Sequence, residues 1–296
     1  KLLKQLNDPY SAPKAALRLE AIGKEAVETL KKGVESSDVE VRFYASEALA
    51  YLGEPAAVEP LAKIARDERA FRVYALTALS GLDESYGELR DLLGSPSAET
   101  RYGAFRALWT LDKNDPFVRG EMLGEDFHYH LIDTVGPPMI HATRSFRPEI
   151  VVFNHGQRLK TPLVLDAGPR IMIHSDGGDT VTVSRFSSNL PDERRQVSTK
   201  VDEVIRAVVD LGGTYPDVVQ ALQAAADSNV LAGRFEEDAI PQVGRDFRRP
   251  DRPVTDQAKA DSIAAAAKEQ EEKESAADSK PRVGFLQRLI PGRAWR

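Results

Sequence analysis

VRFYASEALAYLG, at residues 41–53, sets the pattern for the first third of this chain of 296 residues. Its apolar and small side chains are spaced three and four apart, which places them on one face of a helix. The same pattern returns as FRVYALTALSGLD at 71–83 and as TRYGAFRALWTLD at 100–112. A period of about 30 residues indicates stacked units, because a single helix pair cannot bury its own apolar face.

Second amphipathic segments lie between these stretches and predict that each unit is a pair of antiparallel helices joined by a short turn. At matching positions, small residues let neighbouring helices approach closely and larger ones fill the space between them. The segments are EAVETLKKGV, AAVEPLAKIA and YGELRDLL, the small residues are Ala45, Ala75 and Ala104, and the larger ones are Leu49, Leu79 and Leu108. We therefore expect helical repeats over residues 1–115, with units at about 11–23, 25–53, 55–83 and 85–112.

An arginine recurs in the three copies, as Arg42, Arg72 and Arg101. These side chains either stabilise their own repeats or line one edge and bind an acidic partner, and we retain them as candidate partner-binding residues. Ser37 precedes Glu40 by three residues, which predicts a capping box at the start of the helix. Asp38 and Glu68 each stand four residues before an arginine, the spacing of an ion pair along a helix.

The stretch SSDVEVRFYASEALAYLG, at residues 36–53, resembles a HEAT-type repeat in its acidic residue, its arginine and its ladder of alanine and leucine. The resemblance implies a curved stack of helices, whose usual use is to hold another macromolecule.

After Pro116 the periodicity changes from helical to alternating, which predicts a small antiparallel β domain over residues 116–200. Helical spacing returns at 201–232 and predicts a hairpin of helices packed on that domain, with Gly212 at the end of the first helix and Thr214 capping the second. The predicted fold class is therefore α+β with several domains: a short all-α HEAT-like solenoid, a small antiparallel β domain with a helical hairpin, and a disordered tail.

The C-terminal part is predicted to be a largely disordered linker over 233–280, followed by a basic amphipathic tail over 281–296. The tail is either a disordered end or a docking peptide for a protein or an anionic surface. Its candidate partner-binding residues are Phe285, Leu286 and Arg288.

All five histidines lie between residues 128 and 174. His128 and His130 are expected on the same face of a strand, and with His141 they are weak candidates for a metal site. A solvated or edge strand is the alternative, and we predict no bound metal and no cofactor. The phosphate-binding, nucleophile-elbow and zinc-protease motifs are all absent from the sequence, so we predict no catalytic residues and no enzyme.

Composition excludes several classes of protein. The chain has no cysteine, which rules out disulfides and thiolate metal sites, and it lacks the run of roughly 20 apolar residues that a membrane-spanning helix needs. Its net charge is -6, and a basic stripe that would bind duplex nucleic acid is missing outside residues 281–296. We therefore expect no transmembrane span and no nucleic-acid partner.

A second resemblance covers about residues 11–245 and is carried by the repeats, by GPPMIHATRSFRPEIVVFNHGQRL and by VDEVIRAVVDLGGTYPDVVQAL. These segments resemble the C-terminal extension of bacterial proteins related to the flagellar basal-body P-ring protein. The resemblance implies a periplasmic structural component around the flagellar rod, with rod or ring proteins as partners and a ring module and an export signal upstream of Lys1.

The resulting functional hypothesis is a non-enzymatic, structural or protein-binding region of a P-ring-like component of the bacterial flagellum. The alternatives are a HEAT-repeat lyase-like or accessory enzyme with a histidine-containing site, and a scaffold in the cytoplasm, which would apply if no export signal lies upstream.

Overall fold

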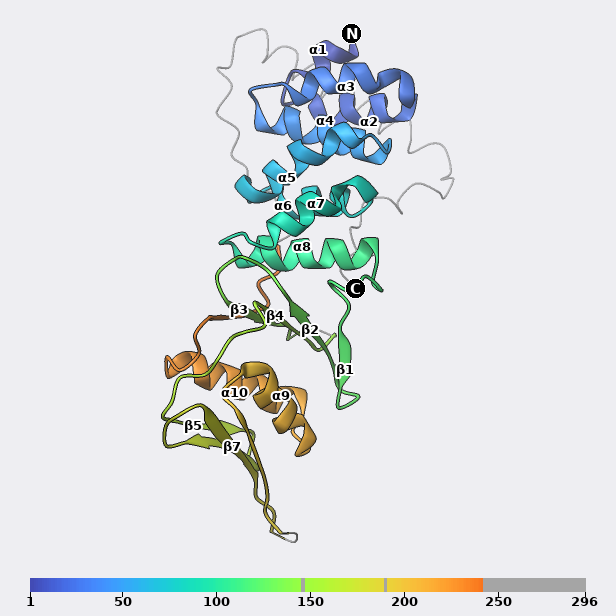
Figure 1. The fold of residues 1–296 in the computed structure, drawn as a ribbon. Helices are drawn as coiled ribbons and strands as arrows, with labels where there is room; N and C mark the ends of the chain where they lie inside the picture. The colour runs from blue at the N-terminus through green and yellow to red at the C-terminus, as the bar shows by residue number, and fades with distance from the viewer. Residues whose placement is uncertain (145–146, 189–190, 242–296) are drawn as a thin grey trace, which may run out of the picture. The chain divides into compact units, whose positions relative to one another are not determined.

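Eight α-helices form the N-terminal part of the described chain (Figure 1). The structure is a computed structural model that describes residues 1–144, 147–188 and 191–241. Short 3-10 turns precede α3, α5 and α7, so that each of these helices begins directly after a tight turn. The helices are α1 (Leu2–Leu6), α2 (Ala12–Ile22), α3 (Val27–Val34), α4 (Val39–Tyr51), α5 (Val58–Asp67), α6 (Arg72–Leu79), α7 (Tyr86–Leu92) and α8 (Ala98–Leu111).

The repeats pack through the alanine and leucine positions that the sequence predicts. Ala45, Ala75 and Ala104 are fully buried, and the leucines four residues after each of them are buried as well. Phe43 stacks on Phe71 of the next copy, with ring centroids 4.7 Å apart. Burial of these apolar surfaces is what joins one helix pair to the next.

The start of α4 differs from the predicted capping box. Asp38, and not Ser37, is the N-cap: its Oδ1 accepts hydrogen bonds from the backbone N–H groups of Glu40 and Val41, at 2.9 and 3.1 Å. A carboxylate satisfies two free donors here and also opposes the positive end of the helix dipole. Because Asp38 is used as a cap, the predicted ion pair with Arg42 does not form.

Two sheets follow the helices. The first has the order β1-β2-β4-β3-β9, with parallel pairing of β2 to β4 and of β3 to β9. The second is an antiparallel meander in the order β5-β6-β7-β8. The strands are β1 (Glu121–Leu123), β2 (Phe127–Ile132), β3 (Met139–Ala142), β4 (Glu149–Phe153), β5 (Leu163–Ala167), β6 (Ile171–Ser175), β7 (Thr180–Arg185), β8 (Glu193–Ser198) and β9 (Arg234–Glu237).

The predicted α+β fold class is confirmed, with parallel pairings added to the expected antiparallel ones. All five residues of β4 are buried, and its continuous apolar run is typical of a strand covered on both faces. In β6 and β7, by contrast, Ile171, Ile173, Val181 and Val183 point inward and alternate with more exposed residues, as predicted.

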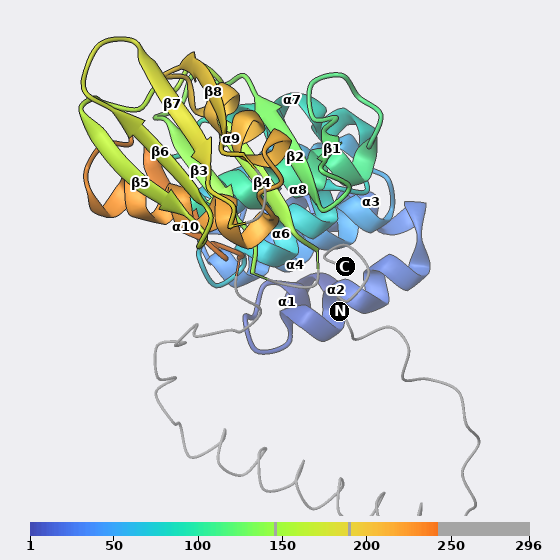
Figure 2. The same cartoon turned by 90° about the horizontal axis from the view of Figure 1, so that it is seen from below.

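Helices α9 (Val201–Asp210) and α10 (Tyr215–Asp227) lie between the two sheets (Figures 1 and 2). Thr214 and Asp217 form a capping box at the start of α10, and Gly212 follows α9 with a φ of 81°. One apolar core contains side chains from both sheets and both helices, among them Tyr129, Ile140, Val152, Leu165, Ile173, Val183, Val204, Ile205 and Leu222. The helical hairpin is therefore part of a shared interior, rather than a layer on one surface.

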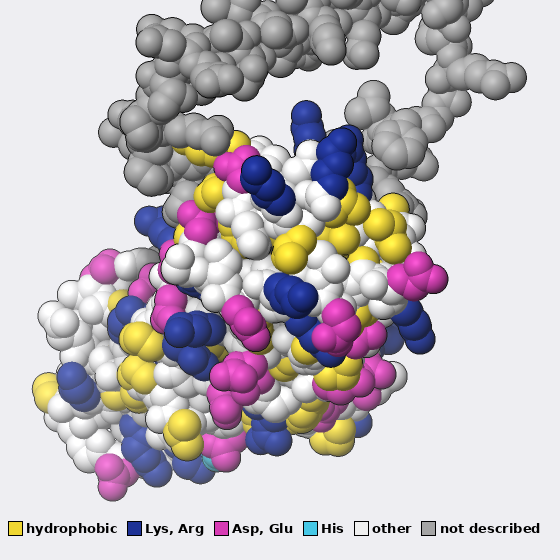
Figure 3. All heavy atoms as spheres, turned by 90° about the horizontal axis from the view of Figure 1, so that it is seen from above, with side chains coloured by type: hydrophobic (Ala, Val, Ile, Leu, Met, Phe, Trp, Pro, Cys, Tyr) yellow, Lys and Arg dark blue, Asp and Glu magenta, His cyan; other side chains and the backbone are white. Residues whose placement is uncertain are grey.

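Half of the large apolar side chains that are exposed in the described residues belong to the first 51 residues. Figure 3, which views the molecule from the side of α1 and α2, shows hydrophobic side chains at the surface beside lysine and arginine. We call the following residues the N-terminal apolar surface: Tyr10 (43% exposed), Leu17 (63%), Ile22 (50%) and Tyr51 (58%).

No helix in the described part of the chain is both long enough and apolar enough to span a bilayer.

Close packing of α3 gives a stability prediction at Gly33. A Cβ added there lies 2.7 Å from Leu6 Cδ2 and 2.8 Å from the Cβ of Ala45. Alanine gains up to about 1 kcal/mol in helix propensity, but overpacking costs about 1–3 kcal/mol. We expect Gly33→Ala to lower the free energy of unfolding in urea by a net amount of about 1 kcal/mol.

Gly87 on α7 is the matched control, because a Cβ there has no heavy atom within 4 Å. We expect Gly87→Ala to be neutral or to stabilise the chain by up to about 1 kcal/mol. Equal effects of the two substitutions would show that α3 does not pack as closely as described.

Candidate functional site

The first two repeat arginines bind acceptors within the helical repeats. Arg42 donates to the carbonyls of Ser36 and Ser37, at 2.9 and 2.7 Å. Arg72 donates to the carbonyl of Ala65 at 3.0 Å and to the carboxylate of Glu99 at 2.8 Å, so its predicted pair with Glu68 is replaced by one with the next repeat.

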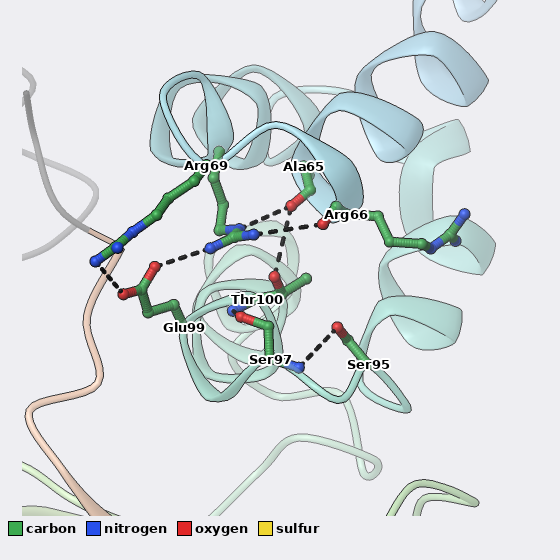
Figure 4. Close-up of polar contacts among 8 residues, drawn as sticks. Ala65, Arg66, Arg69, Ser95, Ser97, Glu99 and Thr100 are labelled. Atoms are coloured by element: carbon green, nitrogen blue, oxygen red, sulfur yellow. Dashed lines mark hydrogen bonds and ion pairs between the residues drawn. The ribbon is translucent and has the colours of Figure 1, made fainter. Parts of the chain in front are cut away.

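Polar contacts also connect the end of α5 to the start of α8. Figure 4 shows Glu99 facing Arg69 and the hydroxyl of Thr100 directed at the carbonyl of Ala65. The Ser97 hydroxyl caps α8 by accepting from the N–H of Thr100, at 3.2 Å. The polar groups at the end of α5 and the start of α8 therefore satisfy one another.

Arg101, the third arginine, leaves the repeats and joins them to the first sheet. Its side chain is completely buried, donates to the carbonyl of Pro137 and stacks on the ring of Phe153 at 4.7 Å. Burial, together with the nearby charge of Arg234, lowers the pKa of Arg101 to about 10. Binding of a partner by Arg42, Arg72 or Arg101 stays a prediction, and the structure places all three guanidinium groups against acceptors of this chain.

A second cluster of buried polar side chains lies where α8 covers the first sheet, and Glu149 is at its centre. The carboxylate accepts hydrogen bonds from the Tyr102 hydroxyl at 2.8 Å and from Arg106 at 3.1 Å, and it faces His130 Nε2 at 3.5 Å. Burial by itself would raise the pKa of Glu149, but His130, Arg106 and Tyr102 outweigh it and lower the pKa to about 2. Glu149 is thus held as an anion in the interior.

The three candidate histidines have different surroundings. His130 Nδ1 lies 2.9 Å from the carbonyl of Val118, and both of its ring nitrogens therefore face acceptors. His141 stacks on Tyr102 with ring centroids 3.8 Å apart, and its two nitrogens have no hydrogen-bond partner in the described structure. His128 shares a strand face with His130 and is half-buried; burial and the charge of His130 lower its pKa.

Metal binding by His128, His130 and His141 stays a prediction. Among the described residues, no group of three or more histidine, aspartate or glutamate side chains is arranged to hold a metal ion. Tyr102 and Phe105 of α8 pack directly on the rings of His141 and His130. His130 and His141 therefore lie inside a filled joint between α8 and the sheet.

Glu149 was missed by the sequence analysis. The one feature of the sequence that could have indicated it is the position of this carboxylate at the start of the apolar run EIVVF, because an unpaired charge there would be costly to bury. Two of its partners, Tyr102 and Arg106, come from α8, more than forty positions earlier, so the local pattern does not identify them.

A surface groove lies between α7 and the β2–β3 loop. Its floor includes Arg90, whose guanidinium lies 4.0 Å from the ring centroid of Phe117 and 5.9 Å from that of Tyr86. The groove has a volume of about 720 Å³. It is lined by Tyr86, Gly87, Arg90 and Asp91 of α7, by Phe117, and by Asp133, Thr134 and Val135 of the β2–β3 loop.

Residues 1–80 match the family model of HEAT repeats. No curated protein matches the chain. Among solved structures, the chain is similar to the complex of CpcE and CpcF of phycocyanin lyase from Nostoc sp. PCC7120, at 23% identity and a TM-score of 0.32. That similarity covers 40% of this chain and 79% of the matched one.

These comparisons correct the flagellar hypothesis. They return HEAT repeats and a lyase complex, and nothing in them indicates a P-ring protein, so the resemblance to a P-ring extension is wrong. The periplasmic, basal-body location and the rod or ring partners depended on that resemblance and are withdrawn with it.

The prediction that the chain is not an enzyme is also wrong: the solved structure that the chain resembles is that of a lyase, so an enzymatic function is no longer excluded. The findings fit the alternative, a HEAT-repeat lyase-like protein or scaffold, better than the main hypothesis. At this TM-score the match supports no assignment of a reaction or a substrate. The remaining candidates, Phe285, Leu286 and Arg288, lie outside the described residues.

His141 gives a prediction of pH dependence. Burial lowers its pKa from the ordinary 6.5 to about 4. As the pH falls below 6.5, the unfolded chain takes up a proton at this residue that the folded chain does not, so stability is lost progressively down to about pH 4. By about pH 5 this contribution reaches about 2 kcal/mol.

We expect His141→Phe, which keeps an aromatic ring against Tyr102, to remove that part of the pH dependence. Urea unfolding at several values between pH 7 and pH 5 measures the difference. Parallel loss of stability in the wild type and the variant would show that His141 is protonated in the folded chain.

Proposed function

We propose that this chain is a protein-binding region whose HEAT repeats contact a partner through the N-terminal apolar surface. The observation that carries the proposal is the exposure of Leu17 and Ile22 on α2 and of Tyr51 at the end of α4, two helices that pack against each other. Exposed apolar side chains that gather on one surface mark sites of protein interaction. The match of residues 1–80 to HEAT repeats supports the same class of function.

The repeat register shows why this surface is open. Lys14 and Arg18 stand thirty residues before Tyr44 and Ala48, both of which are buried in α4. On α2 the equivalent positions are exposed. At these two positions α2 therefore carries cationic side chains where the later repeat has a buried aromatic ring and a buried methyl group.

Four cationic side chains of the first 18 residues form no ion pair in the described part of the chain. Lys1, Lys4, Lys14 and Arg18 are exposed, and none of them forms an ion pair there. Such cations contribute more to the rate and selectivity of association than to affinity, whereas buried apolar side chains contribute most of the binding energy. The partner surface that fits is apolar at its centre and acidic at its rim.

The test replaces Leu17 with glutamate in the full chain. Affinity capture from extract of the source cell, quantified by mass spectrometry, should show proteins that the wild type retains and that Leu17→Glu loses by about tenfold or more. Val164→Glu is the matched control, because Val164 on β5 is also 63% exposed and lies on the second sheet. Melting temperatures should be the same for both variants.

Two results contradict the proposal. One is an identical set of captured proteins for the wild type and Leu17→Glu. The other is equal loss of the same proteins in Leu17→Glu and Val164→Glu, which would indicate a general effect of an added charge.

A further inference from the structure

The groove between α7 and the β2–β3 loop is a second candidate interface, independent of the N-terminal apolar surface. Val135, at the loop, is apolar and fully exposed. Tyr86 and Phe117 are half-buried and present ring surface to the same groove. Neither wall belongs to the residues that form the N-terminal apolar surface.

The β2–β3 loop is a fixed wall. The carbonyl of Gly136 accepts from Asn154 Nδ2 at 2.6 Å, and the carbonyl of Pro137 accepts from the buried Arg101. A Cβ on Gly136 would lie 2.9 Å from Gly94 Cα, so the loop touches the end of the α7 segment closely. The exposed Val135 side chain is consequently held beside the groove by polar contacts on its C-terminal side.

The floor of the groove is also preorganised. Asp115 Oδ1 accepts from the N–H of Phe117 at 2.9 Å, which orients the aromatic residue. The guanidinium of Arg90 lies over that ring, and the pKa of Tyr86 is raised by burial and by its hydrogen bond to Asp115. Rigid aromatic and aliphatic surface of this kind costs little conformational entropy when a ligand covers it.

The rim carries negative charge. Asp91 of α7 and Asp133 of the β2–β3 loop line the groove and are exposed, and Asp83 and Glu84 directly before α7 are exposed as well. Asp133 faces His155 Nδ1 at 3.5 Å; for the other three acids the described structure gives no ion pair. Arg90 is the one cation among the lining residues.

We propose that this groove binds an extended segment of a partner protein that carries an apolar side chain flanked by lysine or arginine. The apolar side chain would pack on Val135, Phe117 and Tyr86, and the basic groups would face Asp91 and Asp133. Charge complementarity selects this occupant, because the same rim repels acidic segments and the phosphates of nucleic acid.

The experiment uses the full chain and fluorescence anisotropy with a panel of labelled peptides of about twelve residues. The panel varies two properties independently, the presence of a central leucine or phenylalanine and the sign of the flanking charges. We expect binding only by the apolar peptides with basic flanks, and weaker binding as the salt concentration rises from about 50 to about 300 mM.

Variants locate the site. Asp91→Asn combined with Asp133→Asn should weaken binding of the best peptide by about tenfold and flatten its salt dependence, and Val135→Ser should weaken it without changing the salt dependence. Asp176→Asn is the control, because Asp176 has a side chain that is 96% exposed and lies at the end of β6 in the second sheet. It should bind as the wild type does.

Several outcomes overturn the proposal. They are the absence of binding by every basic peptide, equal binding of acidic peptides, and unchanged affinity in the three groove substitutions. A dimer in sedimentation velocity that Val135→Ser dissociates would replace the partner segment with a second copy of this chain. None of these results bears on Leu17, so this inference and the proposed function fail separately.

Discussion

A buried carboxylate joins the two halves of this structure. Glu149 belongs to a sheet strand, and two of its partners, Tyr102 and Arg106, belong to the last helix of the repeats. An ion in the interior is tolerated only when its hydrogen bonds are complete, and removal of one partner from such a group typically costs about 3–5 kcal/mol. The geometry of α8 against the sheet is therefore set by the need to satisfy one charge, in addition to the apolar contacts around it.

Arg101 contributes to the same joint and shows how a repeat can be adapted. In the two earlier copies the arginine at this position binds acceptors in the helical repeats. In the third, the guanidinium instead reaches Pro137 and Phe153 of the sheet region. The same repeat position therefore holds an arginine that binds within the helical repeats in the first two copies, and one that connects the last repeat to the first sheet in the third.

The sequence predicts those features that depend on neighbouring residues. Spacing identified the repeat helices, the inward residues of β6 and β7, and the Thr214 cap, since each follows from a local periodicity or a motif of four residues. Asp38 was overlooked as a cap because Ser37 and Asp38 are both good caps and spacing alone does not choose between them. The parallel pairings, the Glu149 joint and the groove were not predicted, because each combines segments that are distant in the chain.

The order of strands in the first sheet has a topological consequence. Its edge strand β9 pairs with β3, and the second sheet and both central helices lie between these two strands in the chain. They follow β4, so the inserted segment leaves the first sheet on one side of β3 and returns to it on the other side. Contacts between residues so far apart in the chain form slowly, so we expect the β3–β9 pairing to form late in folding. Because both sheets and both central helices share one apolar core, we expect the two sheets to unfold as one cooperative unit.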